Sequence, residues 1–421
     1  IEYIDNVRNF IIKDQSQENK EEKRQNPELG YGIIQSSRLL RDYQTEALNK
    51  WMENGKRGCI VLPTGAGKTV IALKAIETTN VSTLIVVPTI NLMDQWEQSL
   101  RHSMNGKTPI GKLGGGHETI NAITVTTYDS AYLKSSYLGN KFEFLIFDEV
   151  HHLASEKYSL IAEQFISPYR LGLTATLERE DGRHTILTML VGNVVFKRDF
   201  AELANQNHLA KYKLRKITVS MLPNEIKEYN KIMQEYKNLL KESRIFFPIR
   251  LEKLVLLSAN STKLRKALLL RNEATELALN SKAKITELER ILRDYQKEKI
   301  IIFTIHTRLA YAISNRFLVP VITHKTKNEE RNEILEGFKK GKYRIISTTR
   351  VLDEGIDVPD ANVGVILSGT GSKREFIQRL GRLLRPKQGK ENTAELIEIV
   401  SMDTSEVFTS NKRKIGISKK N

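Results

Sequence analysis

Cysteine, metal-binding histidine patterns and long apolar runs are scarce in this sequence, and each scarcity excludes a class of protein. The 421 residues include one cysteine, Cys59, which rules out internal disulfides and multi-cysteine zinc or iron–sulfur sites. No apolar run approaches the roughly 18 residues that a membrane-crossing helix needs, and no secretory signal opens the chain. The eight histidines form no metal-ligand pattern such as HExxH. We therefore expect a protein of a reducing interior compartment with no membrane partner.

Negative charge is also in short supply. Lysine and arginine number 66 against 50 aspartates and glutamates, so the formal net charge is +16. Such an excess suggests a polyanionic partner such as nucleic acid, and the alternative is a merely basic protein. The chain opens with Ile1 rather than Met, so we interpret 1–36 as the remnant of an N-terminal domain followed by a charged linker.

Short β-branched runs alternate with helical segments along most of the chain. This alternation predicts an α/β fold in which helices wrap parallel sheets. The runs cover 58–62, 83–87, 122–126 and 142–147 in the first half, and 299–304, 344–347 and 363–367 in the second. We predict two lobes, at 37–205 and 206–400, followed by a basic C-terminal tail at 401–421.

Residues 224–298 differ from both lobes because they lack strand patterns and contain no glycine. Leucines and isoleucines recur there at intervals of three or four residues, which is typical of amphipathic helices. We interpret the segment as a helical insertion that stands off the second lobe. The alternative is an ordinary helical subdomain whose basic face is only solvated.

Residues 62–69 read LPTGAGKT, after one predicted strand and before a helix that we expect at 70–76. Glycines at 65 and 67 let backbone N–H groups turn inward around a phosphate, and the helix N-terminus adds partial positive charge. Lys68 is expected to reach the β- and γ-phosphates, and Thr69 to ligate Mg²⁺. Leu62 stands where the general pattern has glycine, so the strand–loop–helix context supports the assignment. The predicted ATP-binding residues of this loop are Thr64, Gly65, Ala66, Gly67, Lys68 and Thr69.

A buried strand at 142–147 is followed by two carboxylates, Asp148 and Glu149. Because successive strand residues face opposite ways, the two can take different roles. We expect Asp148 to hold Mg²⁺ through water and Glu149 to orient and deprotonate the attacking water. A solvated strand end is the alternative, and the phosphate loop about 80 residues upstream favours the catalytic role. Upstream of both lies Arg41-Asp42-Tyr43-Gln44, whose glutamine amide has the geometry that reads adenine.

These segments, taken in order, resemble the motifs of superfamily-two helicases. The segments are LPTGAGKT (62–69), VVPTINLMDQW (86–96), VTTYDSAY (125–132), DEVHH (148–152), GLTATLERED (172–181), IIFTIHT (301–307), TTRVLDEGIDVP (348–359) and QRLGRLLR (378–385). DEVHH and TATLERED resemble those of the XPB family, double-stranded DNA translocases of nucleotide excision repair and transcription initiation, and the chain is similar to its short archaeal members. The resemblance implies two RecA-like lobes with a thumb-like insertion at 224–298.

The resemblance also implies roles for individual residues. Arg41 and Gln44 would contact adenine, and Gly355 and Asp357 would approach the nucleotide from the second lobe. Arg382 and Arg385 resemble arginine fingers that stabilise charge on the γ-phosphoryl group. Residues that would couple hydrolysis to lobe movement are His151, Thr174, Thr176 and Gln378. Residues that would contact DNA are Thr89, Thr127, Tyr128, Arg179, His306, Thr349 and Arg350, with Arg179 in an element that the family associates with strand separation.

The expected function is an ATP- and Mg²⁺-dependent DNA translocase or helicase that moves 3′→5′, as the resemblance implies. It would bind duplex and single-stranded DNA without sequence preference, as a cytoplasmic, nucleoid-associated protein or a nuclear one in a eukaryote. Three alternatives stay open: an RNA-directed helicase of the same superfamily, a clamp that uses ATP only as a binding switch, and a scaffold that serves a partner nuclease. Relatives carry a damage-recognition domain before the first lobe, and only about 36 residues precede it here.

Overall fold

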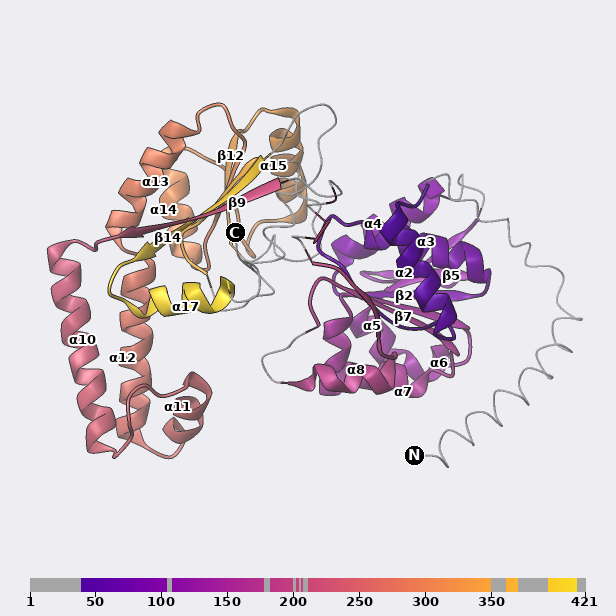
Figure 1. Ribbon diagram of the computed structural model, residues 1–421, viewed down its shortest axis with the longest axis horizontal. Coiled ribbons are helices and arrows are strands. Elements are labelled where there is room, and N and C mark those ends of the chain that lie inside the picture. Colours follow the sequence, from indigo (N-terminus) through magenta and orange to yellow (C-terminus); the bar gives the residue numbers. More distant parts are fainter. Residues whose placement is uncertain are drawn as a thin grey trace, which may run out of the picture. The chain divides into compact units, whose positions relative to one another are not determined.

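The structure is a computed structural model that describes residues 39–103, 108–177, 182–199, 202–203, 206, 211–349, 361–369 and 393–414. Expectations for 1–36, Arg179, Arg350, Gly355, Asp357, Gln378, Arg382 and Arg385 lie outside the described residues. The chain divides into two compact units between Leu203 and Ala204 (Figure 1). Within the described ranges, no helix combines the length and apolarity that crossing a membrane requires.

The first unit is built on an eight-stranded sheet with strand order β4-β3-β5-β2-β6-β7-β1-β8. Neighbouring strands pair in parallel, except for the antiparallel β3–β4 pair at one edge. Its strands are β1 (Arg57–Val61), β2 (Thr83–Val87), β3 (Ile110–Gly114), β4 (His117–Thr119), β5 (Ile123–Thr127), β6 (Phe144–Asp148), β7 (Tyr169–Thr174) and β8 (Val194–Lys197). Every residue of β2, β5 and β6 is buried, as expected for parallel strands covered on both faces.

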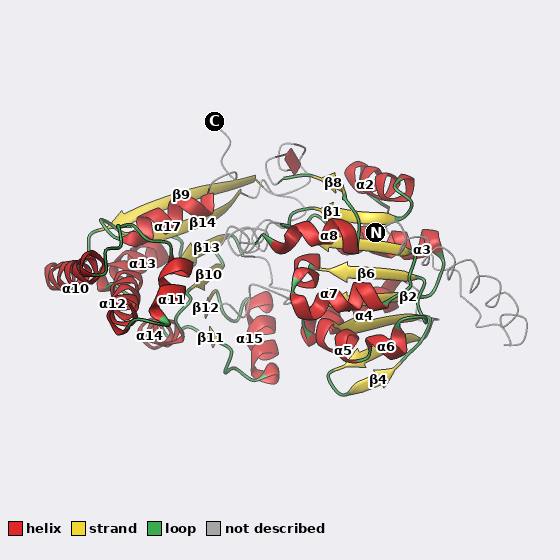
Figure 2. Ribbon diagram, turned by 90° about the horizontal axis from the view of Figure 1, so that it is seen from below, coloured by secondary structure: helices red, strands yellow, loops and turns green. Residues whose placement is uncertain are grey.

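Helices cover both faces of this sheet (Figures 1 and 2). They are α2 (Asp42–Glu53), α3 (Lys68–Thr79), α4 (Ile90–Ser103), α5 (Tyr128–Leu133), α6 (Ser135–Leu138), α7 (Glu156–Gln164) and α8 (Leu187–Leu190), with the 3₁₀ turns η1 (Val150–Ala154) and η2 (Arg183–Ile186). One apolar cluster joins the sheet to α5, η1, α7 and α8 and includes Phe147, Leu153 and Phe165. The sheet is therefore the centre of a three-layer unit.

The second unit holds a six-stranded, all-parallel sheet with strand order β11-β12-β10-β13-β14-β9. Its strands are β9 (Lys211–Val219), β10 (Ile300–Phe303), β11 (Val321–Ile322), β12 (Ile345–Thr348), β13 (Val363–Ile366) and β14 (Thr393–Ser401). Its helices are α10 (Pro223–Glu242), α11 (Leu251–Ser258), α12 (Thr262–Leu279), α13 (Lys282–Asp294), α14 (Thr307–Phe317), α15 (Asn328–Lys340) and α17 (Ser405–Lys414). Both sheets confirm the predicted α/β fold with two parallel-sheet lobes.

The helical segment at 224–298 divides into two parts, which corrects the single insertion that we expected. Helices α10, α11 and α12 share their own apolar cluster, which includes Tyr236, Leu254 and Leu270. Figure 1 shows α10 and α12 side by side, with α11 at the end away from the sheet. Helix α13 instead buries Leu288 and Ile291 in the cluster of the six-stranded sheet. The periodicity of apolar residues could not separate the two parts, because both are amphipathic helices.

The expected tail from 401 also differs from the structure, because α17 occupies Ser405–Lys414. Its Glu406 carboxylate is 2.5 Å from the Lys284 ammonium of α13, and both side chains are at most 3% exposed. Lys284 also donates to the Leu367 carbonyl, at 2.9 Å, just beyond β13. A buried charge needs a partner of opposite sign, so this ion pair ties α17 to the sheet.

Candidate functional site

The phosphate loop lies between β1 and α3 and depends on two glycines. Gly65 and Gly67 have φ values of +84° and +79°, a region that side chains disfavour. A Cβ at Gly67 would lie 2.5 Å from the Gln44 amide nitrogen, so a larger residue would also displace this buried amide. Helix α3 begins at Lys68, two residues earlier than predicted, and Gly67 is its N-cap. Lys68 Nζ donates to the carbonyls of Leu62 and Pro63, at 3.0 and 3.3 Å, so the ammonium lies against the loop.

Helix α2 fastens the sequence Arg41–Gln44 to this loop. The Gln44 amide donates to the Ala66 carbonyl at 3.0 Å and accepts from the Arg41 backbone N–H at 2.9 Å. Tyr43, to which the sequence assigned no role, donates its hydroxyl to the same Ala66 carbonyl at 2.7 Å. The structure thus brings Gln44 to the phosphate loop, and its contact with adenine stays a prediction.

Asp148 is the last residue of β6 and is only 7% exposed. Its Oδ2 accepts from the indole N–H of Trp96 at 2.8 Å, and its Oδ1 accepts from the Glu149 backbone N–H at 3.0 Å. Burial raises the pKa of this carboxyl above its ordinary value, and the Trp96 hydrogen bond opposes that rise. Trp96 lies within one of the motifs found in the sequence, but the sequence gave no reason to assign it a role. An apolar pattern does not show which buried indole has a polar partner.

Glu149 follows the strand rather than continuing it. Its backbone has φ +49° and ψ +54°, a left-handed conformation. The chain therefore turns at Glu149, so the two carboxylates are not related by the strand alternation that we predicted. Glu149 Oε2 accepts from the Thr174 hydroxyl at 3.2 Å and lies 3.4 Å from His151 Nδ1. His151 Nδ1 is 3.2 Å from the same hydroxyl, whose oxygen is also 2.9 Å from the Thr176 carbonyl, so the two acceptors share its one hydrogen. The structure therefore gathers four predicted site residues into one hydrogen-bonded network.

The residue types at this edge fit a phosphate group and a hard cation. The Thr64 hydroxyl oxygen is buried and has no hydrogen-bond partner among the described residues, which leaves it able to bond a ligand in the loop. Lys68, the N-terminus of α3 and the glycine turn supply positive charge and N–H donors. Mg²⁺ prefers oxygen ligands and is commonly held by one or two protein groups together with substrate phosphates. Asp148 and Thr69 are groups of that kind.

The candidate DNA contacts of the first unit lie where β2 and β5 meet the next helices. Thr89 precedes α4, and its hydroxyl accepts from the Leu92 N–H at 3.3 Å. Thr127 is the N-cap of α5, and its hydroxyl accepts from the Ser130 N–H at 3.2 Å. The expectation for Tyr128 needs correction: its side chain is 1% exposed and its hydroxyl donates to the Asp148 carbonyl at 3.1 Å. The ring packs in the apolar core of the first unit and the hydroxyl is used within that unit, so we no longer assign Tyr128 a contact with DNA.

In the second unit, His306 and Thr349 follow β10 and β12. His306 is the N-cap of α14, and its backbone N–H donates to the Thr304 hydroxyl at 3.3 Å. Thr349 is 5% exposed, and its N–H donates to the Ile322 carbonyl at 3.1 Å. A further hydroxyl pair links two strand ends, because Thr304 Oγ1 and Ser368 Oγ are 2.7 Å apart.

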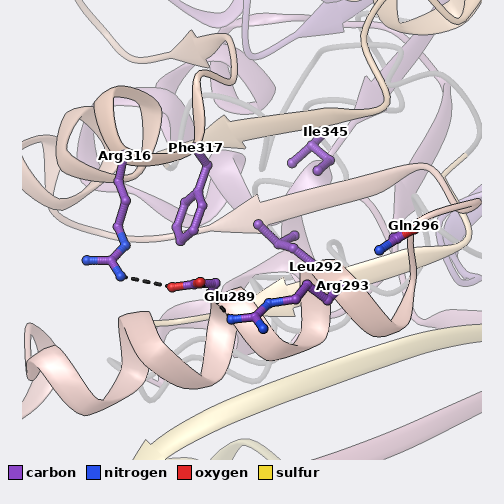
Figure 3. Close-up of a pocket in the computed structure, with 7 residues that line it drawn as sticks. All are labelled: Glu289, Leu292, Arg293, Gln296, Arg316, Phe317 and Ile345. Atoms are coloured by element: carbon purple, nitrogen blue, oxygen red, sulfur yellow. Dashed lines mark hydrogen bonds and ion pairs between the residues drawn. The ribbon is translucent and has the colours of Figure 1, made fainter.

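A hollow of about 520 Å³ in the second unit carries none of the predicted site residues (Figure 3). It is lined by Glu289, Leu292, Arg293, Gln296, Arg316, Phe317 and Ile345. The Glu289 carboxylate pairs with Arg293 at 2.7 Å and Arg316 at 2.9 Å. Ile345 opens β12, so the hollow lies at the amino end of that strand, whereas the residues predicted from this unit follow the carboxyl ends.

Comparisons with known proteins agree with this geometry. The family model of the type III restriction enzyme res subunit matches residues 38–179, and that of the ERCC3/RAD25/XPB C-terminal helicase matches 271–418. The chain is 47% identical over 388 residues to the "DNA 3′-5′ translocase XPB2" of Sulfurisphaera tokodaii, covering 92% of this chain and 87% of that protein. It is 27% identical over 410 residues to "General transcription and DNA repair factor IIH helicase/translocase subunit XPB" of Danio rerio. It covers 48% of that protein, so it spans about half of this larger relative.

Among solved structures, the crystal structure of the Pyrococcus furiosus Hef helicase domain has the same fold. The TM-score is 0.57 at 19% sequence identity, with 89% of this chain and 98% of that chain covered. At this identity the likeness concerns the fold alone. The relative from Sulfurisphaera tokodaii combines high identity with nearly complete mutual coverage. The chain therefore belongs to the XPB family of DNA helicases and translocases.

Proposed function

We propose that this chain is an ATP- and Mg²⁺-dependent DNA translocase that moves 3′→5′ and remodels duplex DNA in excision repair, transcription initiation or both. One observation carries the proposal: a phosphate loop, a buried carboxylate and a hydrogen-bonded glutamate share one edge of the first sheet. The name of the relative from Sulfurisphaera tokodaii supplies the direction.

The chain's own groups account for the chemistry at that edge. Lys68, Thr69 and the glycine turn would hold the phosphates, and Asp148 with Thr69 would hold Mg²⁺, which offsets phosphate charge when bound. The Glu149 carboxylate accepts a proton from the attacking water. The Thr174 hydroxyl fixes that carboxylate through their 3.2 Å hydrogen bond. Because Thr174 also contacts His151 and Thr176, the base and the coupling residues move together.

The second unit completes the site in this proposal. Gly355 and Asp357 approach the nucleotide, Gln378 receives the nucleotide state from His151, and Arg382 and Arg385 stabilise charge on the γ-phosphoryl group. Arg41 and Gln44 contact adenine. These assignments rest on the motif resemblance.

DNA is bound through its phosphates. Thr89, Thr127, His306, Thr349 and Arg350 contact the backbone, and Arg179 acts where strands separate. Small hydroxyls and helix N-termini suit phosphate contacts without base readout. Affinity should therefore fall steeply with added salt and vary little with sequence. A fluorescence anisotropy titration across salt concentrations and unrelated duplexes checks this, and an affinity unaffected by salt would contradict the groove that we propose.

ATP hydrolysis measured side by side with no nucleic acid, duplex DNA, single-stranded DNA and RNA tests the proposed function. Duplex DNA should stimulate most. Stimulation by RNA alone would favour the RNA-directed alternative, and nucleotide binding without turnover would favour an ATP-switched clamp.

We further propose that the protein works with a partner nuclease and is found with the nucleoid in the cytoplasm. Purified nuclease should then alter the ATPase rate on DNA.

A further inference from the structure

Two buried aromatic side chains hold Asp148 from different helices. The Trp96 indole N–H donates to the carboxylate Oδ2 at 2.8 Å, and the Tyr128 hydroxyl donates to the backbone carbonyl of the same residue at 3.1 Å. Trp96 and Tyr128 are each 1% exposed, so packing fixes both donors. The position of the Asp148 carboxylate therefore depends on where α4 and α5 lie.

The same two helices begin at candidate DNA contacts. Thr89 directly precedes α4, and Trp96 lies two helical turns further along it. Thr127 caps α5, and Tyr128 is the first residue of that helix. The preceding strands, β2 and β5, are neighbours in the sheet, so both helix N-termini open at one part of its edge. Each helix thus follows a residue that we predict to contact DNA and carries a hydrogen-bond donor to Asp148.

We propose that Trp96 and Tyr128 are positioning residues that connect the DNA-contacting ends of α4 and α5 to the metal-binding carboxylate of Asp148. The inference rests on the proposed function and adds a physical route from DNA to ATP hydrolysis. A carboxylate that ligates a metal is oriented by its outer hydrogen bonds, and loss of such a partner typically weakens metal affinity or activity by about 10–100-fold. DNA that shifts α4 or α5 would then change how well Asp148 is placed for Mg²⁺.

The chain offers a matched control for a merely structural role. Trp51, the other tryptophan, is fully buried, and its indole N–H donates to the Arg170 carbonyl at 3.0 Å. It therefore shares burial and a buried hydrogen bond with Trp96 but does not bond to a carboxylate through that nitrogen. Trp51→Phe and Trp96→Phe each keep a large ring and remove one N–H donor.

The first experiment measures ATPase rate against Mg²⁺ concentration, with and without duplex DNA, in wild type, Trp96→Phe, Tyr128→Phe and Trp51→Phe. Trp96→Phe should raise the Mg²⁺ concentration for half-maximal rate about 10-fold or more and reduce the ratio of DNA-stimulated to basal rate. Tyr128→Phe loses the hydrogen bond to the Asp148 backbone carbonyl and should mainly reduce the ratio of DNA-stimulated to basal rate. Trp51→Phe should leave both quantities unchanged. Trp96→Phe behaving like Trp51→Phe would overturn the inference.

The second experiment does not depend on turnover. In Trp51→Phe, Trp96 is the only tryptophan, so its fluorescence reports on the Asp148 contact. Adding MgADP should change this emission, and ADP with EDTA should not; equal responses would overturn the link to the metal. This arm also holds if Trp96→Phe fails to fold.

If wild type is not stimulated by DNA, the proposed function fails together with the DNA half of the inference, while the Mg²⁺ shift and fluorescence still decide the metal half. If wild type is stimulated and Trp96→Phe keeps the wild-type ratio and Mg²⁺ requirement, the inference alone fails.

Discussion

The two units share a parallel sheet but differ in the side chains that follow the carboxyl ends of their strands. In the first unit, β6 ends in Asp148 and Glu149 is the next residue, while β1 leads into the loop that precedes Lys68. In the second, the described residues that follow β10 and β13 include hydroxyls, of which Thr304 and Ser368 bond each other at 2.7 Å. Hydroxyls suit contacts to phosphate, whereas the general base that we propose is a carboxylate, which can accept a proton from water.

In the function that we propose, one reaction is divided between two copies of the same fold. The first unit would supply the groups for phosphate binding, metal binding and proton transfer. The segments expected to supply Gly355, Asp357, Gln378, Arg382 and Arg385 follow β12 and β13 of the second unit in sequence. Loops beyond the carboxyl ends of parallel strands are where such folds place functional residues. If this division is right, each unit needs the other for fast turnover.

The largest expected effect comes from removing the arginines of the second unit. Arginines that stabilise γ-phosphoryl charge are worth on the order of 10³–10⁵ in rate. Arg382→Ala or Arg385→Ala should therefore reduce kcat far more than ATP affinity, because the charge develops in the transition state. DNA-stimulated ATPase beside equilibrium ATP and DNA binding tests this. Near-normal turnover in both variants would leave the first unit as the whole catalyst.

The next effect concerns the base of the first unit. Glu149→Gln should retain ATP binding and lose roughly 10²–10⁴ in rate, since the amide cannot accept a proton from water. Lys68→Ala is the contrast, because loss of a phosphate contact should weaken binding as well as rate. Both are measured by nucleotide binding and steady-state ATPase. A wild-type rate for Glu149→Gln would show that another group is the base.

Several interior strands of both sheets were predictable, because they are runs rich in β-branched residues. The run at 83–87 coincides with β2, and the runs at 122–126 and 363–367 overlap β5 and β13 within one residue at each end. Strands β7 and β14 were missed because each contains polar residues. The buried Arg170 side chain in β7 donates hydrogen bonds to three backbone carbonyls, and the buried Glu398 carboxylate in β14 accepts from the Ser410 hydroxyl. Such partners come from elsewhere in the fold and leave no local pattern.

The candidate site shows the same limit. The spacing of glycines and carboxylates predicted the loop and the pair Asp148–Glu149, because phosphate and metal chemistry requires those residue types. It did not predict that Trp96 and Tyr128 would converge on Asp148. Tyr128 was misassigned because its motif position suggested DNA, whereas its hydrogen-bond partner is brought close only by the pairing of β2 with β5 and β6.

A stability effect should distinguish the second unit from the first. Replacing Lys284 by Met would leave the buried Glu406 carboxylate without its cation, which typically costs about 3–5 kcal/mol. The exposed pair Lys263–Glu242 gives the control, because Lys263→Met should cost about 0–1 kcal/mol. Urea unfolding of both variants measures this. Equal losses would mean that the buried pair does not hold α17 to the sheet.

A moderate effect should follow from shortening the helical projection. Replacing 230–273 by a short linker removes most of α10, α11 and α12 but keeps Glu225, Tyr229 and α13. Glu225 accepts from Ser281 and Lys282, and the Tyr229 hydroxyl accepts from the Ser405 N–H, so the base of the projection stays tied to α13 and α17. Basal ATPase should survive while duplex affinity falls, since the removed helices carry lysines and arginines. Loss of folding would place α10–α12 in the core of the unit.

The smallest effect concerns the ionised Asp148 carboxylate, which sharpens the contrast between a buried charge that we propose for Mg²⁺ binding and the paired buried charge of the second unit. Burial raises the folded-state pKa of Asp148 above its ordinary value, so ionisation opposes folding and the wild type loses stability as pH rises through that folded pKa. Asp148→Asn does not titrate. Its one amide oxygen can accept from either Trp96 or Glu149 but not from both, which lowers stability by an amount that does not depend on pH. The melting temperature of the wild type should therefore fall relative to that of the variant as pH rises through the titration of the wild-type carboxyl. MgADP should raise the melting temperature of the wild type more than that of the variant, because a ligand stabilises the form that binds it. Thermal melts at several pH values, with and without MgADP, measure both effects. A difference in melting temperature between variant and wild type that stays constant with pH would show that the two N–H donors of this carboxylate offset the cost of its burial.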